Sequence, residues 1–372
     1  MRTIDHALSA SGIASQRFIR QLHFGPSLAE QGLGARRALL QASLHADEIP
    51  PMLVAQHLRR RLTELEAQGR LRGEVVLLPA CNPIGLSQQV WGRMQGRFEL
   101  ASGQNFNRLY PDLAEAAAAQ VQLGDDAAAN LRALRSALHA ALDAQPARTA
   151  LQQLRAQLLR LAIDADVVLD MHCDNDAVLH LYAAPQQAAQ AQQLGDCIGS
   201  PLALLAEESG DFPYDEACSM VWRRLRERLG ERVPYACFAS TLEFRGETEV
   251  SHALAEQDAE ALIRFLALQG FIDDAAQAPD PTCSLRPLAG CMHVHAPHAG
   301  VVVFGDTLGR EVKAGQAIGE LIDPVSGEST PLCSPVDGLH FARELQRWAQ
   351  AGQSVAKVAG MEALRSGKLL SA

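Results

Sequence analysis

The sequence predicts an α/β protein: a mixed, mostly parallel sheet flanked by helices, with an all-β barrel-sandwich module at the C-terminal end. Up to about residue 280, short apolar runs of strand length alternate with longer stretches of helical periodicity. This alternation is typical of a parallel sheet covered by helices. Beyond that point proline, glycine and valine become more frequent, and helical periodicity fades. We therefore expect two domains, residues 1–280 and residues 281–372.

Each element of the first domain has a local signal. Residues 1–34 are expected to form a lead-in with an edge strand or a helix, and Pro50-Pro51 are expected to open the first long helix, because proline is tolerated in a first helical turn. Strands are predicted at residues 37–44, 74–80, 166–171, 179–184, 201–205 and 237–244. Helices are predicted from Pro51 to about residue 69, within residues 113–163, and at residues 215–229 and 252–269. The polar segment 81–111 is long for a simple connection, which favours a functional loop.

The C-terminal region contains two copies of a strand–turn–strand unit. Residues 297–304 match residues 335–342, and residues 314–321 match residues 351–358. Two copies predict a small two-fold β module, which resembles a biotinyl/lipoyl barrel. A carrier of that type needs a modifiable lysine at an exposed hairpin tip, and residues 323–328 between the copies contain none. We therefore interpret the module as a lid or an interface and expect its lysines to be dispensable for activity.

Composition narrows the class of protein. Of the 372 residues, 48% are hydrophobic and 20% are charged, as in ordinary globular proteins. The net charge of −10 argues against nucleic acid and anionic membrane surfaces as partners. The eight cysteines include no CxxC pair, and no apolar run has the length of a signal peptide or a membrane span. These features predict a cytoplasmic protein, and a homo-oligomer is an open alternative to a monomer.

A possible metal site follows the first confident strand. His45 and Glu48 lie in the loop between that strand and the helix that begins at Pro50, so both side chains can converge on one point. His172 directly follows the predicted strand 166–171, and Asp170 could orient it. Sites in parallel α/β sheets form at the carboxyl ends of strands. Together the two histidines and the glutamate make a His₂Glu set that leaves one zinc position open, as in catalytic zinc sites.

Three further features are candidates for a site. Glu243 lies in or at the end of an apolar strand, where a carboxylate is costly unless it is ion-paired or functional. Asn107 and Arg108 close the polar loop; arginine recognises carboxylates with a planar fork, although the loop could equally be tied to its own carbonyl groups. A weaker metal candidate, without an acidic or thiol partner nearby, consists of His293, His295 and His298.

Five ordered motifs resemble those of the succinylglutamate desuccinylase/aspartoacylase family, a branch of the zinc carboxypeptidase-like fold. They are HxxE at residues 45–48, Asn-Pro-x-Gly-Leu at 82–86, Asn-Phe-Asn-Arg-x-Tyr-Pro at 105–111, Asp-Met-His at 170–172 and Leu-Glu-Phe-Arg-Gly at 242–246. The resemblance spans roughly residues 35–360 and includes the β module. Two departures stand out: the first motif reads His-Ala-Asp-Glu instead of the commoner His-Gly-x-Glu, and Phe-Arg-Gly is typical of a less-characterised deacylase branch.

The resemblance implies a role for each residue. One zinc ion would be bound by His45, Glu48 and His172. Glu243 would be general base and then general acid, and Arg97, with Arg93 as the alternative, would polarise the scissile carbonyl group. The substrate would be held by Asn107, Arg108 and Arg245.

The predicted function is hydrolysis of the amide bond of a small N-acyl amino acid or related N-acyl amine that carries a carboxylate. Two alternatives remain open. One is a metallocarboxypeptidase that acts on peptides, and the other is a non-catalytic metal-binding protein. The presence of Glu243 argues against the second, because a structural zinc site has no use for another carboxylate.

Overall fold

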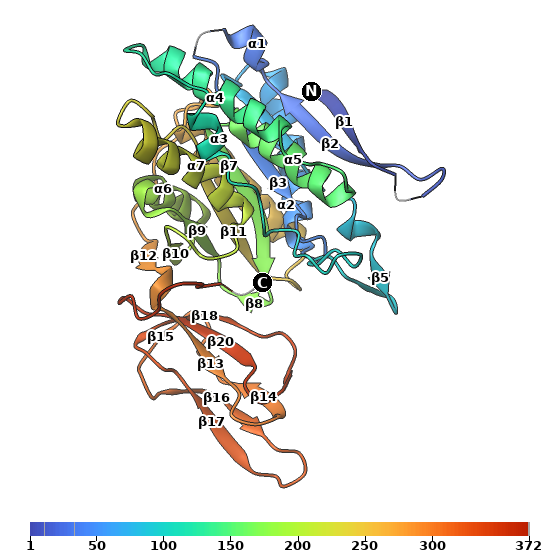
Figure 1. Cartoon of the computed structure of the whole chain (residues 1–372). Helices are drawn as coiled ribbons and strands as arrows, with labels where there is room; N and C mark the ends of the chain where they lie inside the picture. Colours follow the sequence, from blue (N-terminus) through green and yellow to red (C-terminus); the bar gives the residue numbers. More distant parts are fainter. Residues whose placement is uncertain (11, 33, 371–372) are drawn as a thin grey trace.

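The computed structural model describes residues 1–10, 12–32 and 34–370, and within these residues a large sheet with helices on both faces is followed by a separate β module (Figure 1). The large sheet has nine described strands in the order β1-β2-β4-β3-β7-β11-β9-β10-β12. Most neighbours in the sheet are parallel, and the exceptions are β1–β2, β2–β4 and β9–β11. The predicted fold class is confirmed.

The strands of the large sheet are β1 (Arg2–Leu8), β2 (Arg17–Phe24), β3 (Arg37–Ala42), β4 (Glu74–Leu78), β7 (Val167–Asp174), β9 (His180–Ala183), β10 (Leu202–Leu205), β11 (Phe238–Gly246) and β12 (Ser284–Pro287). The helices are α1 (Leu28–Gln31), α2 (Pro50–Ala67), α3 (Ala114–Ala118), α4 (Ala127–Asp143), α5 (Ala150–Ile163), α6 (Ala188–Ile198), α7 (Tyr214–Leu229) and α8 (His252–Leu268). Short 3₁₀ turns occur at η1 (Gly85–Ser87), η2 (Pro185–Gln187) and η3 (Leu288–Gly290).

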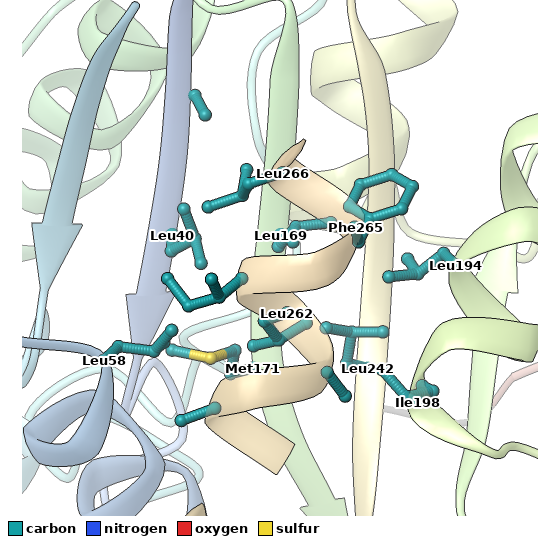
Figure 2. Packing of buried hydrophobic residues seen from close by; sticks show 14 of the residues in the cluster. Leu40, Leu58, Leu169, Met171, Leu194, Ile198, Leu242, Leu262, Phe265 and Leu266 are labelled. Atoms are coloured by element: carbon teal, nitrogen blue, oxygen red, sulfur yellow. The ribbon is translucent and has the colours of Figure 1, made fainter. Parts of the chain in front are cut away.

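The central strands are buried on both faces because their side chains alternate between two cores. One core lies under α2, α6 and α8, and the other lies under α3, α4, α5 and α7. On β7, for example, Leu169 belongs to the first core and Val168 to the second. Figure 2 shows the first core, where Leu262, Phe265 and Leu266 of α8 lie near Leu40, Leu169 and Leu242 of three adjacent strands.

Several element boundaries differ from the prediction. The described residues of segment 1–34 form an antiparallel hairpin, β1 with β2, and the short helix α1. β7 continues to Asp174, so His172 lies within the strand and not after it. β12 pairs with β10, so the large sheet extends past the boundary expected at residue 280. Segment 81–111 contains the small hairpin of β5 (Gln89–Val90) and β6 (Arg93–Met94).

None of the described helices is long and apolar enough to span a membrane.

The β module has the predicted two-fold construction. Its strands are β13 (Cys291–His295), β14 (Gly300–Phe304), β15 (Glu311–Val312), β16 (Ala317–Ile322), β17 (Ser329–Cys333), β18 (Gly338–Arg343), β19 (Trp348–Ala349) and β20 (Ser354–Ala359). β14 pairs with β16 in one sheet, and their repeat counterparts β18 and β20 pair in the other. Each sheet also takes one strand from the other repeat, since β15 pairs with β18 and β19 with β14. β8 (Asp176–Ala177), from the first domain, extends the sheet of β18.

Candidate metal centre

Two adjacent parallel strands, β3 and β7, bring three buried side chains to one edge of the sheet. β3 ends at Ala42, and Ser43 then adopts the left-handed conformation with a φ of 68°, which turns the chain out of the sheet. His45 and Glu48 follow in the loop before α2, which begins with Pro50 as predicted. His172 points to the same place from β7. All three residues are at most 7% exposed.

The carboxylate of Glu48 lies between the two imidazole rings. Its Oε1 atom is 2.9 Å from Nδ1 of His45, and its Oε2 atom is 2.7 Å from Nδ1 of His172. The backbone N–H of Cys173 donates to the same Oε2 atom at 3.2 Å. The two rings meet edge to face, with centroids 4.9 Å apart. The three predicted ligands therefore converge.

The outer nitrogen of each imidazole ring has an acceptor. Nε2 of His45 is 2.9 Å from Oδ1 of Asn105, an atom that also accepts the backbone N–H of Asn107. Nε2 of His172 is 2.8 Å from Oδ2 of Asp170, whose other oxygen accepts from Gln41. Both Nε2 atoms therefore carry a proton, and both Nδ1 atoms face Glu48. Asp170 was anticipated as an orienting residue, whereas Asn105 was noted only as part of a motif.

This arrangement fits a metal ion. An imidazole lone pair directed at a carboxylate oxygen is repulsive unless a proton or a cation lies between them. Each of the three residues can offer one ligand atom, and these atoms lie within 4.8 Å of one another; among the described residues this is the group that meets such a test. Two imidazole nitrogens and a carboxylate are a donor set that zinc accepts, with outer hydrogen bonds that are usual at such sites.

Glu243 lies next to this group. On β11 it is in register with His172 of β7 and with His180 of β9. Its Oε2 atom is buried and has no hydrogen-bond partner among the described residues. Burial, reinforced by the charge of Glu48, raises the pKa of Glu243 to about 8. The carboxyl group is thus held beside the candidate metal ligands, and no described residue forms an ion pair with it.

Opposing effects set the pKa values of the ligands. Burial raises the pKa of Glu48, but the two histidines outweigh burial and bring this pKa well below its usual value. Burial, with a contribution from Arg97, lowers the pKa of His45. Burial also acts to lower the pKa of His172, but Asp170 and Glu48 more than offset it, and the pKa lies well above its usual value. The carboxylate of Glu48 is therefore held in its charged form.

Arg97 reaches His45 and Glu48. One nitrogen, Nη1, is 3.3 Å from Oε1 of Glu48 and 3.3 Å from Nδ1 of His45. The preceding residue, Gly96, is tied to the ligand loop: its carbonyl accepts from Ala46 N–H at 3.0 Å, and its N–H donates to Asp47 at 3.1 Å. A Cβ atom on Gly96 would lie 2.0 Å from the Asp47 nitrogen, so only glycine allows this approach. Asp47, at the variable position of the first motif, therefore helps to place Arg97.

Asn107 and Arg108 also line the cavity, in positions fixed by the backbone. Oδ1 of Asn107 accepts the N–H of Tyr214 at 2.9 Å, at the start of α7, and Nη1 of Arg108 donates to the Asn107 carbonyl at 2.7 Å. Arg108 is therefore tied to a local carbonyl group, as one interpretation from the sequence has it, and it also lines the cavity. Burial lowers the pKa of Arg108, and nearby acidic residues oppose this.

Arg245 is not brought to the cavity. The register of β11 against β7 shifts between Glu243 and Gly246, and Arg245 has a φ of 60° in this bulge. Simple alternation would place residues 243 and 245 on the same face, and the bulge breaks that alternation. The guanidinium group instead forms a two-point ion pair with Asp258 of α8, at 2.8 and 2.9 Å. The expected substrate contact is therefore not supported by the structure.

Of the remaining candidates, His293 lines the cavity, whereas Arg93, His295 and His298 do not. Arg93 is an exposed residue of the β5–β6 hairpin and does not line the cavity. His293 and His295 stack on β13 with ring centroids 6.0 Å apart, and Nδ1 of His293 is 2.8 Å from the Ser354 hydroxyl. His298 is 2.9 Å from the Thr330 hydroxyl. These histidines are not part of the metal-binding group found among the described residues.

The cavity at the ligands has a volume of about 130 Å³ and includes residues that sequence reasoning missed. Asp215 and Glu216, in the first turn of α7, lie in its wall; burial raises the pKa of Asp215 to about 6 and that of Glu216 to about 7. Lys357 of the β module and Leu369 and Leu370, near the end of the chain, also line it. The sequence places Asp215 and Glu216 side by side at the start of a predicted helix, and this pair of acidic residues could have indicated a site. No pattern in the sequence indicates that residues of the β module line the cavity.

The comparisons with known proteins agree with this architecture. The family model of the succinylglutamate desuccinylase/aspartoacylase catalytic domain matches residues 34–269, so the chain belongs to that family. The resemblance inferred from the five motifs is thereby confirmed. No curated protein matches the sequence.

Solved structures of family proteins share the fold. One from Shewanella amazonensis SB2B is 24% identical, with a TM-score of 0.85 over 96% of this chain and 98% of that chain. One from Shewanella frigidimarina NCIMB 400 is 22% identical, with a TM-score of 0.84 over 96% of each chain. One from Rhodobacter sphaeroides is 17% identical, with a TM-score of 0.66 over 97% of this chain and 96% of that chain. Because the matches cover nearly the whole chain, the shared fold includes the β module.

The outer hydrogen bond to His172 predicts an effect on metal affinity. Asp170→Ala should lower affinity for zinc by about 10- to 100-fold, because the ring loses the acceptor that fixes its tautomer. Asp170→Asn keeps an acceptor oxygen and should lose less. Competitive titration of metal-free protein measures both. Equal affinities in the wild type and the alanine variant would contradict the tautomer argument.

The position of Arg245 predicts that its substitution lowers the stability of the fold without lowering catalytic activity. Arg245→Met should destabilise the fold by about 3–5 kcal/mol, because Asp258 is left buried without its partner. The double variant Arg245→Met/Asp258→Asn should recover most of this, since no charge remains unpaired. Denaturant unfolding measures stability, and turnover per folded molecule should stay normal in both variants. A stable Arg245→Met protein with poor turnover would return Arg245 to substrate binding.

Proposed function

We propose that the protein is a zinc-dependent hydrolase that cleaves the amide bond of a small N-acyl amino acid or related N-acyl amine, with zinc on His45, Glu48 and His172. The observation that carries the proposal is Glu243. A buried carboxyl group with an unpartnered oxygen, beside a His₂Glu set, has no structural use. It is what a general base at a catalytic metal site requires, whereas a purely structural metal site needs only its ligands.

The chain supplies each function that the reaction needs. Zinc, when bound, acts as a Lewis acid on the amide carbonyl and lowers the pKa of water at the site. Glu243 takes the proton from the attacking water and delivers it to the departing amine. Arg97, next to the ligand loop, donates to the oxygen that becomes negative during attack. Asn105 and Asp170 hold the imidazole rings in the required tautomer.

The size of the cavity supports a small substrate. Its walls are formed on one side by the first domain and on the other by Leu288, Lys357 and the segment around Leu369. The backbone N–H groups of Leu369 and Leu370 both donate to Ser209, so this segment is fastened over the first domain. Arg108 in the cavity wall suits a substrate carboxylate. An extended peptide would need a long groove, and a cavity of about 130 Å³ therefore favours the deacylase over the carboxypeptidase.

The state of the cysteines is consistent with a reducing compartment. Cys173 and Cys291, which line the cavity, are free thiols, and all eight cysteines of the chain are free in the structure. Free thiols are usual in cytoplasmic proteins, which supports a cytoplasmic location.

A hydrolysis screen tests the function. Zinc-loaded protein is incubated with N-acetyl, N-formyl and N-succinyl amino acids and, in parallel, with short peptides, and free amine is quantified. Release of amine from at least one N-acyl amino acid is expected, and it should stop after chelation and return with zinc. Cleavage of peptides alone would favour the carboxypeptidase, and cleavage of nothing with zinc bound would favour the non-catalytic protein.

Glu243 and His45 should respond differently to substitution. Glu243→Gln should lower turnover by about 10²- to 10⁴-fold with metal content unchanged, because an acid–base group is lost but no ligand is. His45→Ala should lose metal and activity together. Metal analysis and steady-state kinetics on the same samples separate the two outcomes. A Glu243→Gln protein with full metal and near-normal turnover would remove Glu243 from the mechanism.

A further inference from the structure

One side chain of the β module enters the cavity of the first domain. Lys357, on β20, places its Nζ atom 2.7 Å from Oδ2 of Asp174, the last residue of β7. Both residues line the cavity that contains the metal ligands. Burial lowers the pKa of Lys357, but Asp174 more than offsets it, so the lysine stays charged. The absence of a carrier lysine led us to regard the module's lysines as dispensable, and this contact is a reason to treat Lys357 separately.

Asp174 lies among acidic groups. Glu48 and Glu243 line the same cavity as Asp174, so the carboxyl groups of these three residues share one cavity. The other groups near Asp174 are His180, whose Nε2 atom is 3.9 Å from Oδ2, and the backbone N–H of Asn175, which donates to Oδ1 at 2.8 Å. The ammonium group of Lys357 is therefore the cation that balances this carboxylate at hydrogen-bond distance.

The pair belongs to a larger contact between the domains. Asp176, two residues after Asp174, accepts from Arg343 at 2.8 Å and from Arg347 at 2.9 Å. Ala177 of β8 pairs with Ala342 of β18. Three cations of the module thus bind the segment that directly follows the metal ligand His172. The end of β7 is held from the module side as well as by its neighbours in the large sheet.

The two copies of the repeat differ at the position of Lys357. The repeat aligns Lys357 with Glu320 of the other copy, where the glutamate accepts a hydrogen bond from the Ser329 hydroxyl. The neighbouring positions differ in the same way. Leu339 and Phe341 are buried against the first domain, whereas their counterparts Val301 and Val303 are 36% and 43% exposed. The lysine and the buried apolar pair both belong to the second copy, residues 335–358.

We propose that Lys357 is a positioning residue of the active site: acting through Asp174, it holds the end of β7, and with it His172, in place beside Glu243. The inference rests on the proposed function. It assigns the β module a part in catalysis beyond closing the cavity. A small displacement of β7 would move a metal ligand relative to the general base, and displacements of that kind have large effects on rate.

Four variants test this. Lys357→Met should lower kcat about 10- to 100-fold with KM changed less than about twofold, in protein that is folded and zinc-loaded. Lys357→Arg should restore most of kcat, because a cation can again reach Asp174. Asp174→Asn should show a similar loss, and the double variant Lys357→Met/Asp174→Asn should be no worse than either single variant. Lys313→Met, at an exposed lysine of the same module that pairs with Asp337, is the matched control and should behave as the wild type.

The outcomes separate a positioning role from a structural one. A merely structural pair would lower the melting temperature while leaving kcat per folded, metal-loaded molecule unchanged, and that result would overturn the inference. Losses that add up in the double variant would also overturn it, since Lys357 would then not act through Asp174. If Lys357→Met does not fold, Asp174→Asn and Lys357→Arg still test the inference. A wild-type kcat in Asp174→Asn would then contradict it.

A second measurement needs no substrate. Amide hydrogen exchange of the zinc-loaded protein should become faster in residues 171–175 of Lys357→Met, with β4 unchanged as an internal reference. Unchanged exchange at the end of β7 would contradict the inference whatever the kinetics show. A wild-type protein that hydrolyses none of the N-acyl substrates would contradict the proposed function alone, since the exchange result still decides whether Lys357 positions β7.

Discussion

A buried carboxylate between two imidazole rings is the constraint on which the rest of the site depends. Glu48 faces the Nδ1 atoms of His45 and His172 at 2.9 and 2.7 Å, inside a protein interior where unpaired charges are costly. Such an arrangement needs a cation or a shared proton to be stable. It also needs both rings to present the same nitrogen inwards. The outer acceptors Asn105 and Asp170 meet that second need.

The geometry of the sheet explains how these groups meet. β3 and β7 are adjacent and parallel, so the loop after one and the end of the other lie at the same edge. β11 adds Glu243 in register with His172. The bulge that follows turns Arg245 away to Asp258, and this keeps a guanidinium group from neutralising Glu243. The carboxyl group is left unpaired because the strand changes its register immediately after it.

The β module shows how a symmetric unit becomes specialised. Its two halves share strands and turn positions, yet only the half that faces the first domain carries Phe341 at a fully buried position and Lys357 at the cavity. Its counterpart residues Val303 and Glu320 face outwards or pair within the module. The contact therefore depends on side chains that differ between the copies and not on the repeated backbone.

The sequence by itself determined the alternating strands and helices, the repeat, the family and the three residues that could hold a metal ion. These follow from local patterns: apolar runs, proline at a helix start, and short motifs at the ends of strands. Only the tertiary structure decided that Arg245 leaves the site, that Asn105 is the partner of His45, and that Lys357 enters the cavity from the β module. A bulge, an amide orientation and a contact between domains depend on residues far apart in the chain, such as Asp174 and Lys357, which are 183 positions apart. No local pattern in the sequence carries information about such a pairing.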